Sequence, residues 1–208
     1  LGVCLVDIGG GTTDIAVFTN GAIRHTAVIP IAGDQITNDI AMALRTPTKS
    51  AEDIKCHYGC ALRSLADTKE MVEVPDVGNR GSRQLSRQTL AEVIEPRVEE
   101  LYCMVQAELR RSGFEELLSS GIVITGGSAS LQGMVELGEE IFHMPVRLGL
   151  PNYHGNLKEV IHTPRYSTGI GLIMAGIQQM QHQHGAKLQG GSAKQIFTRM
   201  KGWFQKNF

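Results

Sequence analysis

The 208-residue sequence has no apolar run near the ~20 residues that a membrane-spanning helix requires, so no such helix is expected. Cysteine is scarce, and the four cysteines lack the pairing of a structural metal site. Cys56 and Cys60 would share one face of a helix with His57 between them, but a full ligand set is missing. We therefore favour buried, reduced thiols. Because no export segment is visible, we expect a reducing cytoplasmic compartment.

Positive and negative side chains nearly cancel, giving a net charge of −1, but they are unevenly distributed. Residues 194–208 contain four basic side chains and no acidic one, which leaves −5 for the rest of the chain. An acidic body without a basic patch argues against nucleic acid as a partner, and the basic end indicates a separate task for that end. The chain begins with Leu1 inside an apolar run, so we expect an N-terminal part to precede it.

The most informative segment lies between two apolar runs, residues 3–8 and 15–18. It contains an acid, three glycines and two threonines: Asp7, Gly9, Gly10, Gly11, Thr12 and Thr13. Consecutive glycines let bare N–H groups approach an anion, and the threonine hydroxyls add donors. Asp7, at the end of a strand, is placed to hold a hydrated Mg²⁺ beside phosphates. A glycine-rich hairpin without a ligand is the alternative, but the flanking acid and Thr-Thr-Asp favour a phosphate loop. No lysine follows, as a Walker loop would require.

A second glycine turn follows a later apolar run. Gly126, Gly127 and Ser128 close a predicted strand and open a predicted helix. Such a turn can press its backbone against a flat base or an α-phosphate. Any α/β protein can use glycine there, so this signal is weak alone and gains weight from the first loop.

Apolar runs and turn residues predict strands at about 3–8, 13–18 and 22–29. Helical spacing predicts helices at about 36–44, 50–65 and 86–112. Ser50 is a plausible cap, and Pro96 should bend or interrupt the third helix. Residues 70–85 look irregular or weakly β. A strand near 121–125, a helix with Leu131 and Ile141, a strand at 145–148 and a helix at 168–179 follow. This order predicts an α/β fold: a mixed sheet flanked by helices, with an inserted small subdomain.

The C-terminal segment 194–208 has apolar residues three and four apart. They are Ile196, Phe197, Met200, Trp203, Phe204 and Phe208, and the cationic residues among them include Arg199, Lys201 and Lys206. Residues 181–193 are rich in Gln, His, Gly and Lys and predict a flexible linker. A basic, aromatic amphipathic helix on a tether is typical of an interfacial anchor on an anionic membrane. Docking of the helix on the protein's own body or on a partner is the alternative.

The glycine hairpin resembles the second phosphate loop of the actin, Hsp70 and sugar kinase superfamily. Asp-Ile-Gly-Gly-Gly-Thr-Thr-Asp (7–14), Ile-Thr-Gly-Gly-Ser (124–128) and the tethered C-terminal helix stand in one order, and this order resembles the FtsA family of bacterial actin-like cell division proteins. Val72-Glu73-Val74-Pro75 and the segment 87–97 extend the likeness, so the chain is similar to a C-terminal half of FtsA.

The resemblance implies an actin-like lobe plus an amphipathic helix. The sheet subdomain would comprise 1–46 and 113–180, and the small subdomain over the nucleotide cleft 47–112. The bound nucleotide would be ATP with Mg²⁺. Glu52 and Lys55, three apart on a helix, would face ribose and adenine; a solvated ion pair is the alternative.

The resemblance also implies partners. Arg97 and Glu100 would bind the C-terminal tail of the tubulin-like FtsZ, because an arginine fork pairs well with carboxylates. Self-association into filaments, other divisome proteins and a peripheral place on the cytoplasmic side of the inner membrane complete this expectation.

Catalysis is left unassigned, because no general base for water is identifiable. At most weak ATPase activity is expected, and half of the nucleotide site is missing. A chaperone-type ATPase or a sugar kinase on the same fold is the competing hypothesis, and a pilus-assembly protein is a third. The basic aromatic C-terminus favours the membrane adaptor, because neither enzyme class needs it.

Overall fold

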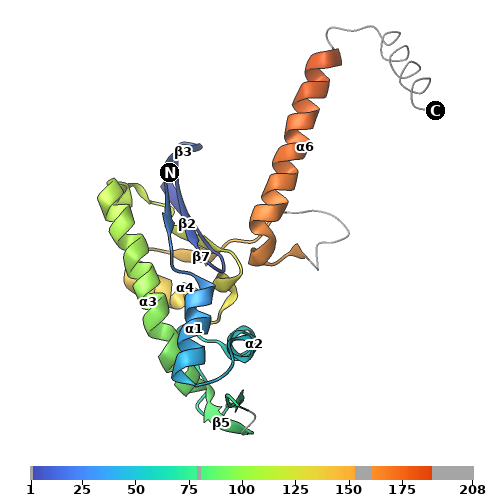
Figure 1. Cartoon of the computed structure of the whole chain (residues 1–208). Coiled ribbons are helices and arrows are strands. Elements are labelled where there is room, and N and C mark those ends of the chain that lie inside the picture. The colour runs from blue at the N-terminus through green and yellow to red at the C-terminus, as the bar shows by residue number, and fades with distance from the viewer. Residues whose placement is uncertain (1, 79–80, 153–160, 189–208) are drawn as a thin grey trace, which may run out of the picture. The chain divides into compact units, whose positions relative to one another are not determined.

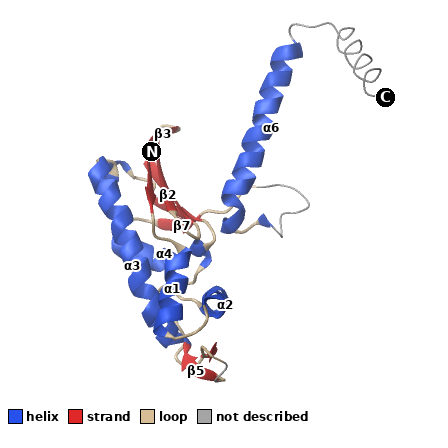
Figure 2. Cartoon of the chain, viewed as in Figure 1, coloured by secondary structure: helices blue, strands red, loops and turns tan. Residues whose placement is uncertain are grey.

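The sheet that carries both glycine turns has five strands (Figures 1 and 2). The computed structural model describes residues 2–78, 81–152 and 161–188, with side chains up to residue 181. The strands are β1 (Gly2–Ile8), β2 (Thr13–Thr19), β3 (Ala22–Ile29), β6 (Ile122–Thr125) and β7 (Val146–Leu148), in the order β3-β2-β1-β6-β7. The first three pair antiparallel, whereas β6 pairs parallel with both β1 and β7. The predicted α/β fold with a mixed sheet is thus confirmed.

Strand β1 lies at the centre of this sheet. Its Cys4, Val6 and Ile8 are fully buried while the intervening residues are half-exposed, because alternate side chains point to opposite faces. At the next turn, Asn20 and Gly21 both have positive φ, which the Asn-Gly pair predicted for a two-residue hairpin.

Helices and a small hairpin occupy the long connection between β3 and β6. They are α1 (Gly33–Ala43), α2 (Thr48–Tyr58), β4 (Met71–Pro75), β5 (Ser82–Ser86) and α3 (Arg87–Ser112). The weakly β segment near 70–85 proves to be the antiparallel pair of β4 and β5. The helix expected over 50–65 is shorter and begins earlier: it starts after Pro47, so Ser50 is not its cap.

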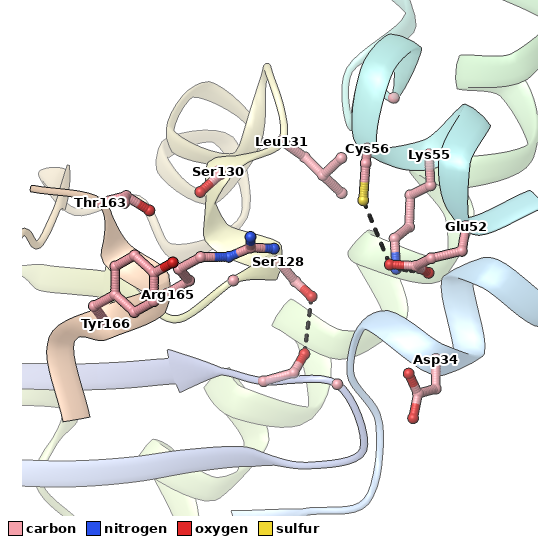
Figure 3. A pocket seen from close by; sticks show the side chains of 14 residues that line it. Asp34, Glu52, Lys55, Cys56, Ser128, Ser130, Leu131, Thr163, Arg165 and Tyr166 are labelled. Carbon is pink, nitrogen blue, oxygen red and sulfur yellow. Dashed lines mark hydrogen bonds and ion pairs between the residues drawn. The ribbon is translucent and has the colours of Figure 1, made fainter. Parts of the chain in front are cut away.

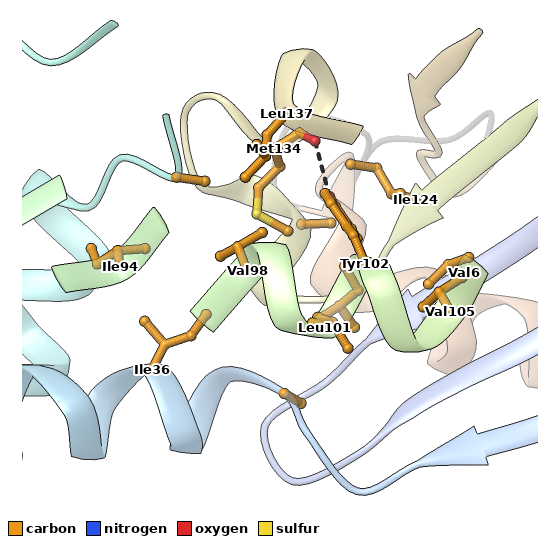
Figure 4. Packing of buried hydrophobic residues seen from close by; sticks show 14 of the residues in the cluster. Val6, Ile36, Ile94, Val98, Leu101, Tyr102, Val105, Ile124, Met134 and Leu137 are labelled. Atoms are coloured by element: carbon orange, nitrogen blue, oxygen red, sulfur yellow. Dashed lines mark hydrogen bonds between the residues drawn. The ribbon is translucent and has the colours of Figure 1, made fainter. Parts of the chain in front are cut away.

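Helix α3 supplies much of the core (Figure 4). Its Val98, Leu101 and Val105 are buried, and the Tyr102 hydroxyl donates to the Met134 carbonyl at 2.9 Å. The helix continues through Pro96, where a bend or break was expected. Pro96 is exposed, so the ring and the carbonyl that loses its donor lie on the solvent side.

The elements after β6 differ in detail from the prediction. The turn Gly126–Ser128 opens a short 3₁₀ turn (Ser128–Ser130), and α4 (Met134–Phe142) begins only after Gly133, which has positive φ. A further 3₁₀ turn, Pro164–Tyr166, precedes α6 (Ser167–Leu188).

Helix α6 belongs, from Thr168 on, to a second unit of the chain. It continues to Leu188, although the sequence predicted a helix ending at 179 and a linker over 181–193. The predicted amphipathic helix over 194–208 lies outside the described residues. Among the residues that are described, no helix is long and apolar enough to cross a membrane.

Strand β3 is tied to the C-terminal half of α3 by a polar cluster. His25 Nε2 lies 2.7 Å from Glu108 Oε1, and two Arg111 nitrogens donate to the same carboxylate at 2.7 and 2.8 Å. The His25 ring also stacks on Phe114, with centroids 6.1 Å apart. Hydrogen bonds from Arg111 and then from His25 lower the pKa of Glu108 from 4.5 to about 2.

The first prediction follows from this shift. A carboxylate whose pKa is lowered by folding stabilises the fold above its unfolded pKa, and this stabilisation disappears as pH falls from 4.5 towards 2. Replacing Glu108 by Gln should lower the melting temperature at pH 7 by about 1–4 °C. The difference from wild type should shrink below pH 4.5 when thermal unfolding is followed by circular dichroism. The exposed Glu140→Gln variant is the control, and a Glu108→Gln deficit that persists unchanged at pH 2 would contradict the assignment.

Candidate functional site

One cavity of about 590 Å³ brings the two glycine turns together (Figure 3). The turn after β1 contributes Gly9 and Gly10, and the turn after β6 contributes Gly127 and Ser128. The lining is completed by Asp34, Glu52, Lys55, Cys56, Gly59, Ser130, Leu131, Thr163, Arg165 and Tyr166. The expected meeting of the two loops at one site therefore agrees with the structure.

The Gly9 carbonyl oxygen holds three segments in place. It accepts a hydrogen bond from the backbone N–H of Gly33 at 3.1 Å and another from Ser128 Oγ at 2.8 Å. One residue further along both segments, the Asp34 N–H donates to the Gly10 carbonyl at 2.8 Å. The first turn of α1 is therefore fixed against the glycine loop. A Cβ at Gly33 would lie 2.4 Å from Ser128 Oγ, so a side chain there would displace the Ser128 hydroxyl from the Gly9 carbonyl.

Gly126 allows the ends of β1 and β6 to approach. Its φ is +88°, and a Cβ there would lie 2.4 Å from both Asp7 Oδ1 and the Ile8 carbonyl oxygen. Gly126 does not line the cavity, so its contribution within this structure is to the close packing of the two strands.

Four other residues of the predicted site also lie outside the cavity lining: Asp7, Gly11, Thr12 and Thr13. Thr13 is fully buried, and its hydroxyl donates to the Ile31 carbonyl at 2.7 Å, so it braces the hairpin. Thr12 is exposed, and its hydroxyl donates to Asp14 at 3.3 Å. These residues keep their predicted ligand roles only as hypotheses.

Carboxylates suited to a hydrated Mg²⁺ stand near the loop. Asp7 and Asp14 are directly opposite in the β1–β2 ladder, and a Cβ on Gly10 would lie 3.3 Å from Asp34 Oδ1. Magnesium usually takes one or two carboxylates and keeps water as its other ligands, which this oxygen-only donor set fits. Within the described part of the chain, no three His, Cys, Asp or Glu side chains cluster as a dedicated metal cage.

Lys55 and Glu52 belong to a buried network between α1 and α2. The Lys55 ammonium donates to the Gly33 carbonyl at 2.9 Å and to Thr37 Oγ1 at 2.8 Å, and it lies 2.7 Å from Glu52 Oε2. The Thr37 hydroxyl also hydrogen-bonds to that Glu52 oxygen. Three partners use all three ammonium protons, and Lys55 is only 5% exposed. Both residues line the cavity, and Glu52, whose side chain is half-exposed, is the more accessible of the two.

The pKa of Glu52 also favours this residue as a hydrogen-bond acceptor for a ligand. Burial acts to raise its pKa, but hydrogen bonds from Lys55 and Thr37 outweigh burial, and the net pKa is lowered. Glu52 is therefore an anionic acceptor at neutral pH. Its second oxygen, Oε1, accepts only a long bond from Cys56 Sγ at 3.4 Å.

Several lining residues escaped sequence reasoning. Arg165 and Tyr166 come from the 3₁₀ turn before α6, and Arg165 extends toward the Ser128 turn in Figure 3. Asp34 and Cys56 lie on α1 and α2. The Gly33-Asp34 pair at the start of a helix could have indicated Asp34 as a site residue. No local sequence pattern marks Arg165 as one.

The four thiols are all free, as expected, but only Cys4 and Cys60 are buried. Cys56 and Cys103 are exposed, so the expectation of buried thiols is wrong for these two. Burial and the hydrogen bond to Glu52 raise the pKa of Cys56, which keeps the thiol protonated. This protonation disfavours a thiolate ligand or nucleophile at the cavity.

The predicted peptide site on α3 is already engaged in ion pairs. Arg97 Nε and Nη2 donate to the two carboxylate oxygens of Asp39 on α1, at 2.6 and 3.1 Å. The third guanidinium nitrogen donates to Glu100. The hydrogen bond with Asp39 raises the pKa of Arg97. Arg97 and Glu100 thus share one face, as the spacing predicted, but the arginine fork is held by a residue that the sequence did not indicate.

Known proteins similar to the chain are cell division proteins. The family model "Cell division protein FtsA" matches residues 4–171. The cell division protein FtsA of Pseudomonas aeruginosa is 60% identical over 214 residues, which cover 100% of this chain and 51% of that protein. The protein of that name from Escherichia coli K12 is 46% identical over 219 residues, with coverage of 100% and 52%. The chain spans about half the length of these curated relatives.

Solved structures share the fold at lower identity. MreB5 of Spiroplasma citri bound to ADP has a TM-score of 0.63 at 20% identity, covering 91% of this chain and 56% of that one. The same protein bound to AMPPNP gives 0.66 at 20% identity, covering 88% and 55%. The PilM–PilN type IV pilus biogenesis complex gives 0.63 at 17%, covering 85% and 46%. At these identities the likeness shows the actin-like fold alone.

The second prediction contrasts neighbouring glycines. Gly126→Ala should lower the free energy of unfolding by about 2 kcal/mol or more, because it adds positive-φ strain to a clash with Asp7 and Ile8. Gly127→Ala should change stability little, since φ is −60° and the nearest atom to a Cβ there is 3.8 Å away. Denaturant unfolding of both variants measures the difference. Equal stability of the two would show that β1 and β6 do not depend on this close approach.

Proposed function

Because the chain belongs to the FtsA family of cell division proteins, we propose that it forms half of an ATP-binding, actin-like adaptor. The adaptor polymerises and tethers a ring of the tubulin-like FtsZ to the cytoplasmic face of the inner membrane. FtsZ, other divisome proteins, further copies of the adaptor and anionic lipid are its partners.

The observation that carries the nucleotide part is the cavity shared by the two glycine turns. Gly10 presents a backbone N–H group where a β- or γ-phosphate would lie, whereas the Gly9 N–H donates to the Thr12 carbonyl at 3.0 Å and closes the hairpin. Gly127 adds bare backbone to the same cavity. Glu52 offers an acceptor for ribose hydroxyls, and Arg165 offers a cation for phosphate or for stacking on a base. ATP would use all of these groups: the glycine loop for its phosphates, Glu52 for its ribose and the backbone at Gly127 for its base or α-phosphate.

Magnesium would be held at the phosphate end by Asp7. The metal would neutralise phosphate charge when bound. The chain's own contribution is the fixed loop, since the hydrogen bonds of the Gly9 and Gly10 carbonyls to the first turn of α1 keep the loop backbone oriented. No side chain of the described residues is assigned as a general base, so efficient hydrolysis is not part of the proposal.

The membrane part rests on the sequence of residues 194–208, which lie outside the described residues. A 15-residue basic helix with Trp203 and three phenylalanines suits the interface of an anionic bilayer. One such helix binds marginally, and a polymer that carries many of them binds far more strongly through multivalency. Polymerisation and anchoring therefore support each other in this proposal.

The third prediction tests the anchor. Deleting residues 194–208 from the full-length protein should abolish co-sedimentation with anionic liposomes and the recruitment of FtsZ to them. ATP affinity should remain, because no residue of the cavity is removed. Trp203 is the only tryptophan of this chain, so in this chain its emission should shift to the blue with anionic vesicles and not with neutral ones. Unchanged liposome pelleting of the truncated protein would refute the anchor.

The fourth prediction concerns the FtsZ tail. Asp39 occupies the arginine fork that an acidic tail would need, so the tail must compete with it. Asp39→Asn should raise the affinity for a synthetic FtsZ C-terminal peptide about two- to fivefold, the size expected of a partly exposed ion pair. Arg97→Ala should lower that affinity. Fluorescence anisotropy measures both, with the exposed Glu99→Gln as control. Weaker binding by Asp39→Asn would place Asp39 in the peptide site instead.

A further inference from the structure

The contact between α1 and α2 contains a hydroxyl that touches no ligand site directly. Thr37 is 4% exposed, and its Oγ1 accepts a hydrogen bond from the Lys55 ammonium at 2.8 Å. Its single proton has two acceptors within reach, Glu52 Oε2 and the Gly33 carbonyl at 3.0 Å. Thr37 does not line the cavity, whereas Gly33 adjoins its glycine loop and Glu52 forms its wall. This one hydroxyl therefore connects both sides of the candidate nucleotide site.

The donors and acceptors of this network balance only with Thr37 present. Lys55 has three protons and three acceptors: the Gly33 carbonyl, Thr37 Oγ1 and Glu52 Oε2. Glu52 Oε2 is then held by Lys55 and the Thr37 hydroxyl together. The Cys56 thiol donates to the other oxygen, Oε1, at 3.4 Å, so the carboxylate is held at both oxygens and its orientation is set. Oε1 is the oxygen left for the cavity, with only the weak Cys56 thiol against it.

We propose that Thr37 is a positioning residue that aims Glu52 at a ribose hydroxyl and thereby sets the preference for ribonucleotides. The inference rests on the proposed nucleotide function of the cavity. The Lys55 ammonium acts in the same way: with its protons used inside the protein, it orients Glu52 and the first turn of α1.

The expected consequence of losing the hydroxyl is specific. Thr37→Val keeps the volume but leaves one Lys55 proton without its acceptor and Glu52 Oε2 with one donor fewer. A hydrogen bond from a ribose hydroxyl to a well-placed carboxylate should give about a tenfold preference for ATP over the matching deoxy-ATP. Thr37→Val should reduce that preference to about twofold or less, whereas Thr37→Ser keeps the hydroxyl and should retain it.

A matched control exists in the same chain. Thr46 is 3% exposed, and its hydroxyl donates to the Pro75 carbonyl at 2.7 Å, away from the cavity. Thr46→Val removes a buried threonine hydroxyl of the same kind. It should lower the melting temperature, as Thr37→Val should, without changing nucleotide preference. This comparison separates aiming of Glu52 from general destabilisation.

The experiment is isothermal titration of the full-length protein and its three variants with Mg²⁺ and ATP, 2′-deoxy-ATP or 3′-deoxy-ATP. Support is a wild-type preference for ATP over at least one deoxy analogue that falls in Thr37→Val and persists in Thr37→Ser and Thr46→Val. An unchanged preference in Thr37→Val overturns the inference and leaves the proposed function intact. A wild type that binds ATP without preference also overturns it. A wild type that binds none of the nucleotides overturns the proposed function itself.

Discussion

The carbonyl oxygen of Gly9 is the contact on which the arrangement of the site depends. It accepts hydrogen bonds from Gly33 and from Ser128, and so joins the β1–β2 turn, the start of α1 and the turn after β6. These segments are far apart in sequence, and this one oxygen holds them together. A Cβ at Gly33 would lie 2.4 Å from Ser128 Oγ and 3.2 Å from the Gly9 carbonyl oxygen, so a side chain there would disturb both contacts.

These contacts explain how the glycine loop after β1 can be rigid and still accessible to a ligand. The Gly9 N–H donates to the Thr12 carbonyl, and the carbonyls of Gly9 and Gly10 accept from the N–H groups of Gly33 and Asp34, which leaves the Gly10 N–H for a ligand. An anion site of backbone N–H groups works best when those groups do not reorganise on binding. Behind the loop, Thr13 closes the hairpin through the Ile31 carbonyl, so the threonine pair divides into one inward and one exposed hydroxyl.

Much of the fold and the position of the site could be predicted from local patterns. The apolar run of β1 and the Asn20-Gly21 turn are local signals, and the structure agrees with both. The acid-plus-glycine signature located a loop that lines the cavity through Gly9 and Gly10. What local patterns do not show is decided by tertiary contacts. Lys55 lines the cavity, but no spacing predicted the bonds of its ammonium to Gly33 and Thr37 on α1. Arg165 was missed because it reaches the cavity through tertiary folding, far along the chain from the glycine loop, and no local sequence pattern marks it.

Helix α1 contacts the cavity loop, α3 and β5. Its first turn bonds to the glycine loop, Asp39 in its middle holds Arg97, and the carbonyl of Leu44 after its last turn accepts from Arg83. The helix is short, and Ile36 and Ile40 on its inner face are buried, so it can shift only with its neighbours. A partner that draws Arg97 away from Asp39 therefore acts on the same helix that orients Gly33 and Thr37. If the two sites influence each other, linkage requires that influence to be reciprocal, and α1 is the element whose contacts would carry it.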